Sequence, residues 1–379
     1  MVCQQGQAKE VKPAAAEGIR RLGADVSHFE RYGRVEKVST GYRVPRACLP
    51  NSPDQGKATR RILSWVLPRM VPILKDDATE GVGVVDVIAR RGSHASPMRY
   101  PGGKATLADF FESAIRSLGL ERPTYIEPYA GGAGAAIELL VKGVVGTVVI
   151  NDLDPAIYAC WKAMVKEPEA FLTLLEKAPV SVEEWKRQRE VYRRRHQVDV
   201  DPLALGFATF YLNRTSRSGV LGAGVIGGYA QAGTYKIGAR FDKDALRARI
   251  ERLAELSGRV RVTHQDGAAR LREYLPKENV FAYVDPPYVD KGSSLYMSAF
   301  EERDHVALAS VLNSHSNTNW VLTYDVSDLI RSLYKARDVS EFRLLYSAHL
   351  RRSNDELRRP AASELIVLSD PVSEALTRA

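Results

Sequence analysis

The residues with the clearest chemical potential are Asp285-Pro286-Pro287-Tyr288, which follow the apolar run 280–284. Such a run indicates a buried parallel strand, and open α/β sheets bind ligands at the carboxyl ends of their strands. The two prolines stiffen the turn and lack N–H groups, so their carbonyls stay available as acceptors. A carboxylate, a fixed carbonyl and an aromatic face suit a planar group that donates through an exocyclic amine, such as a nucleobase. The alternative is a proline-rich turn in which the tyrosine only packs.

A glycine-rich turn lies upstream of this tetrapeptide. Residues 125–127 predict a strand, and residues 128–134, Pro-Tyr-Ala-Gly-Gly-Ala-Gly, lead from it into a helix over about 135–142. Glycines at such a turn let the backbone approach a nucleotide-type ligand, although tight packing of a helix on a sheet uses the same residues. The next strand, over 147–150, ends in Asn151-Asp152. An acidic residue about twenty positions past a glycine turn can hold ribose hydroxyls.

The remaining elements predict an α/β sheet of seven strands. Residues 99–104, Arg-Tyr-Pro-Gly-Gly-Lys, open a helix that reaches about Leu118, and this N-terminus could bind an anion or a carboxylate. Asp154 caps a predicted helix that has Pro155 in its first turn. Further strands are expected over 259–264, which ends at Asp266, and over 280–284, 320–324, 342–349 and 363–368. The last two are close enough in sequence to form an antiparallel ribbon.

Residues 166–258 interrupt the strand–helix alternation and predict a mainly helical insert. The helix over 182–196 carries six Lys and Arg against three Glu, a pattern that usually marks a solvated face. Amide and guanidinium groups follow at Asn213, Arg214 and Arg217, and such groups on loops suit base edges and phosphates. Two more arginines, Arg351 and Arg352, stand between the last two strands and suggest phosphate contact. The insert is therefore the candidate for reading DNA.

The basic character of the chain is concentrated at its start. Six of the eight net positive charges of the 379-residue chain fall in residues 1–97, which show no lasting periodicity. These residues predict either an accessory basic segment or, as we favour, sequence upstream of a natural start at Met98. No apolar run is long enough to span a bilayer, and the three cysteines lack metal-ligand spacing. We expect a cytoplasmic protein with no membrane segment and no metal.

Taken in order, these motifs resemble the Dam-type, or alpha-group, site-specific DNA adenine-N6 methyltransferases over about residues 98–370. Residues 99–104 are similar to that family's motif X, 127–134 to motif I and 151–152 to the end of motif II, and 285–288 match motif IV. The resemblance implies a Rossmann-like seven-stranded sheet, with a catalytic domain of residues 98–165 and 259–379 around the insert. It implies catalysis by Asp285, Pro286, Pro287 and Tyr288. It also implies S-adenosylmethionine as cofactor, bound by Tyr100, Gly102, Gly103, Lys104, Glu127, Pro128, Gly131, Gly134, Asp152, Asp266 and Asp285.

The expected chemistry follows from the weakness of adenine N6 as a nucleophile. Asp285 and the Pro286 carbonyl can accept its two amino hydrogens, which directs the lone pair at a sulfonium methyl. Tyr288 would stack on the base after it is flipped from the duplex. Cytosine-C5 methylation would need a cysteine nucleophile, normally after proline, and none of the three cysteines follows a proline.

We therefore expect an adenine-N6 methyltransferase of double-stranded DNA, acting as a monomer and associated with the nucleoid. A cognate restriction enzyme is a further expected partner. RNA adenine-N6 and DNA cytosine-N4 methylation remain alternatives, because each also modifies an exocyclic amine. A DNA-binding relative that has lost catalysis and a plain nucleotide-binding protein are the other two.

Overall fold

The computed structural model divides the chain into two units, residues 1–71 and 72–379. It describes residues 36–38, 41–43, 84–85, 95–99, 104–289, 300–345, 351–353, 356–358 and 361–378. In the first unit the described part is an antiparallel pair, β1 (Glu36–Val38) and β2 (Gly41–Arg43). The remaining described elements belong to the second unit.

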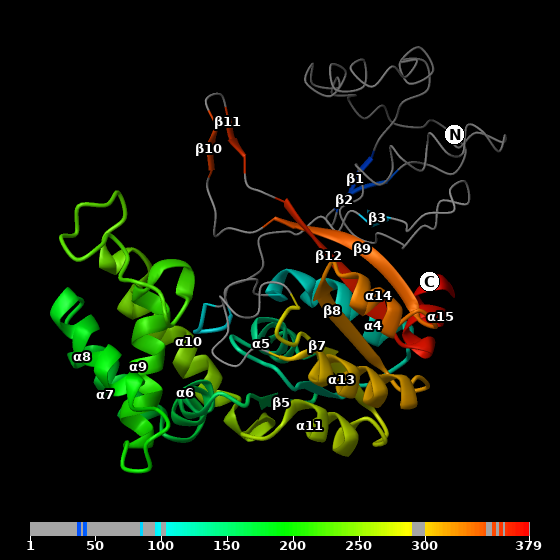
Figure 1. Cartoon of the computed structure of the whole chain (residues 1–379), viewed down its shortest axis with the longest axis horizontal. Coiled ribbons are helices and arrows are strands. Elements are labelled where there is room, and N and C mark those ends of the chain that lie inside the picture. Colours follow the sequence, from blue (N-terminus) through cyan, green and yellow to red (C-terminus); the bar gives the residue numbers. More distant parts are fainter. Residues whose placement is uncertain are drawn as a thin grey trace, which may run out of the picture. The chain divides into compact units, whose positions relative to one another are not determined.

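The second unit is built on one mixed sheet with the strand order β3-β9-β12-β8-β7-β4-β5-β6 (Figure 1). The five neighbouring strands β8, β7, β4, β5 and β6 are parallel, whereas β12 is antiparallel to both β8 and β9. The strands are β3 (Val84–Val85), β4 (Thr124–Glu127), β5 (Thr147–Asn151), β6 (Val260–Thr263), β7 (Val280–Val284), β8 (Trp320–Asp325), β9 (Asp338–Leu345) and β12 (Ala361–Leu368). The predicted seven strands and their antiparallel final pair are confirmed. The two-residue β3, parallel to β9, adds an eighth strand that we did not predict.

The strand order reverses between β4 and β7. From β4 the chain winds outward through β5 to β6, and it then returns to place β7 and β8 on the other side of β4. A point of reversal leaves a crevice beyond the carboxyl ends of the two central strands, which is where open α/β sheets bind ligands. The glycine turn follows β4 and Asp285 follows β7, so both predicted motifs lie at this point.

Alternate residues of the central strands feed two hydrophobic cores, one on each face of the sheet. On β7, Phe281 and Tyr283 belong to the first core, and Ala282 and Val284 belong to the second. Because both faces are covered, β7 reads as a continuous apolar run rather than an alternating one. Helices α4 (Ala108–Ser117), α5 (Gly134–Val141) and α6 (Pro155–Lys166) contribute to the first core, and α11 (Gly267–Tyr274), α13 (Glu302–Ser314) and α14 (Asp328–Leu333) contribute to the second.

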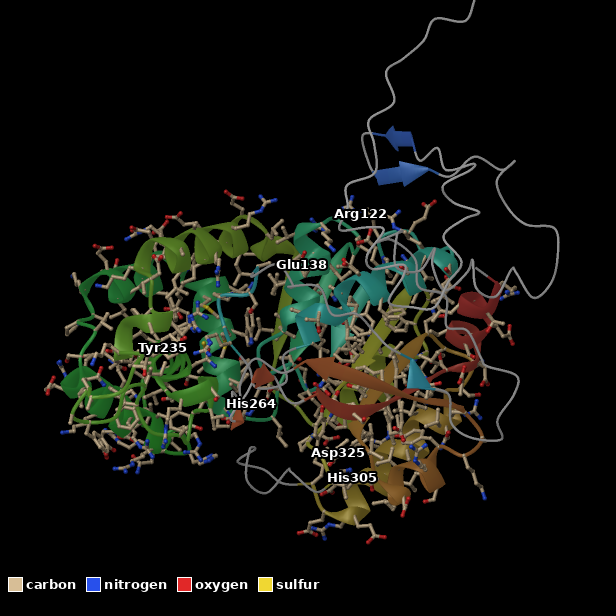
Figure 2. The ribbon with its side chains drawn as sticks, turned by 90° about the horizontal axis from the view of Figure 1, so that it is seen from above. Arg122, Glu138, Tyr235, His264, His305 and Asp325 are labelled. Atoms are coloured by element: carbon tan, nitrogen blue, oxygen red, sulfur yellow. The ribbon has the colours of Figure 1, made fainter. Side chains whose placement is uncertain are left out.

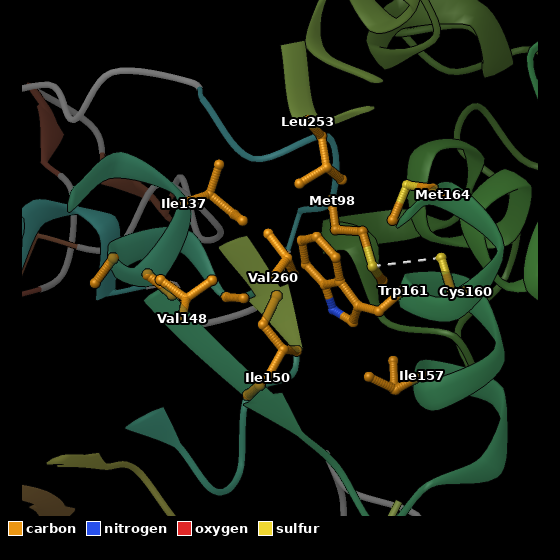
Figure 3. Close-up of a cluster of buried hydrophobic side chains, with 14 of the residues drawn as sticks. Met98, Ile137, Val148, Ile150, Ile157, Cys160, Trp161, Met164, Leu253 and Val260 are labelled. Carbon is orange, nitrogen blue, oxygen red and sulfur yellow. Dashed lines mark hydrogen bonds between the residues drawn. The ribbon is translucent and has the colours of Figure 1, made fainter. Parts of the chain in front are cut away.

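The first core extends to the residues just before the motif X turn. Figure 3 shows the side chains of Met98 and Trp161 together in this core, with Cys160 on α6 beside them. Met98 Sδ lies 3.5 Å from Cys160 Sγ. Ser96 Oγ donates to the Gly132 carbonyl at 2.7 Å, so the chain entering motif X is attached to the glycine turn.

The insert is helical, as predicted, and it packs on the sheet domain through α6. Its helices are α7 (Pro168–Lys177), α8 (Val182–Arg193), α9 (Pro202–Thr215) and α10 (Lys243–Glu255), with short turns η3 (Arg217–Gly219), η4 (Ile237–Arg240) and η5 (Ser257–Arg259). Figure 1 shows α7 to α10 gathered as one green group. The two helices approach closely at Gly206 of α9, where a Cβ would lie 2.6 Å from the Ala159 carbonyl oxygen of α6. None of the helices described above has the length and apolarity needed to cross a membrane.

Candidate active site

Asp285 is the first residue after β7, and two side chains from other elements hold its carboxylate. Thr323 Oγ1 of β8 donates to Asp285 Oδ1 at 2.8 Å, and Lys104 Nζ lies 3.2 Å from Oδ1 and 3.3 Å from Oδ2. Thr323 has one hydroxyl hydrogen and gives it to Asp285, so the Tyr283 hydroxyl, 2.8 Å away, donates to Thr323. The Asp285 side chain is still 21% exposed. The carboxylate is therefore fixed on one side and accessible on the other.

A buried network surrounds Lys104, the first residue of the turn η2 (Lys104–Leu107). Lys104 Nζ donates to the Tyr288 hydroxyl at 2.6 Å, and that hydroxyl donates to Glu364 Oε1 of β12 at 2.7 Å. Lys104 Nζ also lies 3.2 Å from Glu364 Oε2, and the two side chains are only 4% and 2% exposed. Burial raises the pKa of Glu364, and the positive charge of Lys104 opposes that shift. Tyr288 is likewise buried, at 7% exposure.

The glycine turn after β4 is braced by the acidic residue predicted to accompany it. Gly131 and Ala133 have φ of 47° and 42°, a left-handed conformation that favours glycine at such a turn. The backbone N–H groups of Gly131 and Asp154 each donate to one oxygen of Asp152 at 2.9 Å. Burial raises the pKa of Asp152 to about 6. Each Asp152 oxygen has a second lone pair for a ligand hydroxyl.

Three further predicted residues shape the same turn. Glu127 Oε1 accepts a hydrogen bond from Ala136 N in the first turn of α5 at 2.9 Å, and burial raises the pKa of Glu127 to about 8. The Pro128 carbonyl accepts from Asn151 Nδ2 at 2.9 Å. At Gly134 a Cβ would lie 3.0 Å from Ala105 Cβ, so the motif I and motif X helices touch at this glycine.

Asp266 follows β6, and Tyr129 belongs to the glycine turn after β4. Asp266 is exposed and caps α11, its Oδ1 accepting from Ala269 N at 2.8 Å. Gly267 must be glycine, because a Cβ would lie 2.4 Å from the ring of Tyr129. That ring packs edge-on against Phe300 with centroids 5.6 Å apart. Within the described part of the chain, the buried Tyr129 hydroxyl has no hydrogen-bond partner.

The segment after motif IV is held from β8. Asp325 Oδ1 accepts from the backbone N–H of Val289 at 3.1 Å. Beside it, the His305 ring lies 2.7 Å from the Tyr324 hydroxyl, and Figure 2 shows His305 next to Asp325. Burial lowers the pKa of His305. The bond from Val289 to Asp325 fixes the backbone just past Tyr288.

The predicted DNA contacts differ in their surroundings. Asn213 is fully buried: its Oδ1 accepts from Arg99 N at 2.7 Å, and its Nδ2 donates to the carbonyls of Arg99 and Gly219. Both amide hydrogens are thus used inside the protein. Arg214 is also buried, and desolvation with neighbouring arginines lowers its pKa to about 9. Arg217, in contrast, is exposed. Contact of these residues with DNA remains a prediction.

Several predicted residues lie outside the described part of the chain. They are Tyr100, Gly102 and Gly103 and the side chains of Arg351 and Arg352. The backbone of β10 (Arg351–Ser353) pairs antiparallel with β11 (Glu356–Arg358) and places Arg351 opposite Arg358.

The sequence analysis did not predict two residues that contact the site, Thr323 and Glu364. Thr323 gave no signal, because a threonine inside a β-rich run is ordinary. Glu364 did give one. It directly precedes the apolar run 365–368, and a carboxylate buried at 2% exposure requires a partner.

Comparisons with known proteins identify the family of the chain. Residues 100–352, more than half of the chain, match the family described as D12 class N6 adenine-specific DNA methyltransferase. The type II methyltransferase M.MjaIII of Methanocaldococcus jannaschii is 26% identical over 228 residues, which cover 56% of this chain and 77% of that protein.

Two solved structures of the rRNA methyltransferase aviRa from Streptomyces viridochromogenes are also similar, each at 16% identity. They give TM-scores of 0.27 and 0.26, covering 71% and 76% of this chain and 86% and 92% of theirs. At such low scores the fold assignment rests on the strand order instead. Lys104, the glycine turn and Asp285 meet at the sheet's point of reversal, and the family match over residues 100–352 includes all three. The chain belongs to the D12 class of N6 adenine-specific DNA methyltransferases.

Proposed function

We propose that the protein transfers the methyl group of S-adenosylmethionine to N6 of an adenine that is flipped out of duplex DNA at a specific site. The observation that carries this proposal is the state of Asp285. Its Oδ1 accepts from Thr323 and Lys104, while the side chain remains 21% exposed at the end of β7. A fixed, partly accessible carboxylate at the point of reversal suits a substrate that donates through an amine.

The residues around the turn after β4 fit the proposed cofactor. Asp152 has acceptor capacity for hydroxyl groups, and exposed Asp266 lies beyond the end of β6. The buried Tyr129 hydroxyl, unpartnered among the described residues, is a polar group that a ligand could satisfy. We propose that these residues hold the cofactor together with Tyr100, Gly102, Gly103, Lys104, Glu127, Pro128, Gly131 and Gly134. When bound, the cofactor supplies a methyl group on a positively charged sulfur.

Asp285 and Pro286 then activate the amine. Because Asp285 Oδ1 already accepts from Thr323, we propose that Oδ2, which lies 3.3 Å from Lys104 Nζ, accepts one N6 hydrogen through its remaining lone pair and that the Pro286 carbonyl accepts the other. These contacts localise the N6 lone pair for direct in-line transfer, and Asp285 stabilises the positive charge that develops on N6. Tyr288 is proposed to face the base, with its hydroxyl fixed by Lys104 and Glu364.

The DNA contacts proposed are those of the insert and of the β10–β11 hairpin. Exposed Arg217 is the candidate with the freest access, and Arg351 and Arg352 would contact phosphates. Asn213 and Arg214 are also proposed as DNA contacts; both are buried, so contact would require a local rearrangement. The M. jannaschii relative is named a type II methyltransferase, so a cognate restriction enzyme is a further proposed partner.

Methylation with labelled S-adenosylmethionine tests the proposal. The purified protein should label duplex DNA, and base analysis should give N6-methyladenine. Sequencing of DNA from expressing cells should place the mark at one short recognition sequence. Labelling of RNA alone, or N4-methylcytosine as the product, would overturn the proposal in favour of the corresponding alternative.

A further inference from the structure

Glu364 lies beyond residues 100–352, the stretch that matches the family. It stands near the start of β12, opposite Asp325 at the carboxyl end of β8, so the antiparallel strand delivers it to the same edge as Asp285. We propose that Glu364 is a positioning residue for methyl transfer. By serving as a second counter-ion to Lys104, it leaves Asp285 with acceptor capacity for the adenine amine. This inference rests on the proposed function.

The geometry places one ammonium between two carboxylates. Lys104 Nζ is 3.2 Å from Asp285 Oδ1 and 3.2 Å from Glu364 Oε2. Formally, the three groups together carry one negative charge. Lys104 and Glu364 are almost fully buried, so the attraction between them is screened far less than it would be at the surface.

The consequence for Asp285 follows from electrostatics. With Glu364 ionised, the charge of Lys104 is divided between two carboxylates. Without that charge, Lys104 is a buried cation whose remaining carboxylate partner among the described residues is Asp285, and it would be drawn closer to that carboxylate. Lys104, already 3.2 and 3.3 Å from the two Asp285 oxygens, would then compete more strongly with the adenine amine for their lone pairs. Glu364 therefore acts on the reaction through Lys104.

Glu364 also accepts a hydrogen bond from the Tyr288 hydroxyl at 2.7 Å. The effect of this hydrogen bond must be separated from the effect of the ion pair with Lys104. Glu364→Gln removes the charge but keeps an oxygen that can accept from Tyr288. Glu364→Asp keeps the charge on a shorter side chain. Glu341→Gln is a matched control, since Glu341 is an ion-paired, partly buried carboxylate on the adjacent strand β9 and bonds to Arg331.

The experiment compares wild type, Glu364→Gln, Lys104→Met, their double variant, Glu364→Asp and the control. It measures the single-turnover methylation rate, the affinity for DNA and cofactor by calorimetry, and base flipping by 2-aminopurine fluorescence. Glu364→Gln should slow transfer by about 10- to 100-fold, the usual effect of removing the partner that orients a reacting group. Both affinities and the flipping signal should stay within about twofold of wild type, and Glu364→Asp should recover part of the rate.

The double variant decides the mechanism. If Glu364 acts through Lys104, then Glu364→Gln should cost little in the Lys104→Met background, because no cation remains to be balanced. An equal loss in both backgrounds, a wild-type rate for Glu364→Gln, or a loss confined to DNA or cofactor affinity would overturn the inference. Should Glu364→Gln fail to fold, the charge-retaining Glu364→Asp variant decides instead. A folded Glu364→Asp protein with no measurable methylation would overturn the inference as well. If the wild-type protein fails to methylate adenine, the proposed function fails instead.

Discussion

Replacing Asp285 with alanine tests the chemistry most directly. The change removes the proposed acceptor for the N6 hydrogen, whose effect grows as positive charge develops during transfer. Loss of one preorganised group of this kind typically costs about 100- to 1,000-fold in turnover, or about 3–4 kcal/mol. We expect a loss in that range for Asp285→Ala.

The same substitution should leave the fold nearly unchanged, for a reason visible in the network. Removing Asp285 deletes the hydrogen bond from Thr323, which contributes about 1.5–3 kcal/mol when the acceptor is ionised. It also leaves Glu364 as the carboxylate partner of Lys104 among the described residues, so this pair is formally neutral. Loss of the second, partly buried carboxylate beside Glu364 offsets the lost bond. The melting temperature should therefore stay within a few degrees of the wild-type value.

The assay is single-turnover methylation of duplex DNA, with DNA affinity and melting temperature measured in parallel. Asp328→Ala is the control, because Asp328 is an exposed aspartate in the first turn of α14. DNA affinity should be preserved in both variants, since contacts to phosphates dominate it. A folded Asp285→Ala protein that methylates adenine at the wild-type rate would refute the mechanism.

Three further changes probe the packing, the electrostatics and the DNA contact. Gly206→Ala places a Cβ 2.6 Å from the Ala159 carbonyl oxygen and should destabilise the protein by about 1–3 kcal/mol, measured by urea unfolding. Unchanged stability would contradict the close packing of α9 on α6. Glu127 has a folded-state pKa raised from 4.5 to about 8, so the folded state binds the extra proton and the wild-type free energy of unfolding should fall as pH rises between those values. Glu127→Gln does not titrate, so it should lose less stability from pH 5 to pH 9, and parallel profiles would argue against the raised pKa. Arg217→Ala should weaken binding to all DNA sequences and reduce the salt slope by about one unit, and an unchanged slope would remove Arg217 from the phosphate contacts.

The sequence was sufficient for the parts of the site that follow directly after strands. Asp285 and the glycine turn could be placed because a short apolar run ends abruptly in residues with special chemistry. Parallel strands bring such ends to one edge of the sheet. The capping of α6 by Asp154 could be predicted for a similarly local reason, because the Asp154 side chain accepts a hydrogen bond from Ala156 N, two residues away.

The sequence was insufficient where function depends on pairing between distant segments. Lys104 and Asp285 are 181 positions apart, and Glu364 reaches them only through the antiparallel register of β12 with β8. The strand predicted over 342–349 was placed too late, because β9 begins at Asp338 and its first residues are largely polar. Asn213 shows a different difficulty, since an amide beside arginines indicates base recognition and backbone bonding equally well.

The group of Lys104, Asp285 and Glu364 is a poor arrangement for stability and a suitable one for the proposed reaction. One buried and one partly buried carboxylate sharing one ammonium cost desolvation energy that a neutral pair would avoid. Proteins retain such unfavourable groups mainly where activity requires them. In the proposed mechanism, transfer of the methyl group moves a positive charge onto N6, beside Asp285. An excess of one negative charge, fixed before the substrate arrives, would stabilise that charge without reorganisation, and Thr323 and Glu364 are the residues proposed to keep it in place.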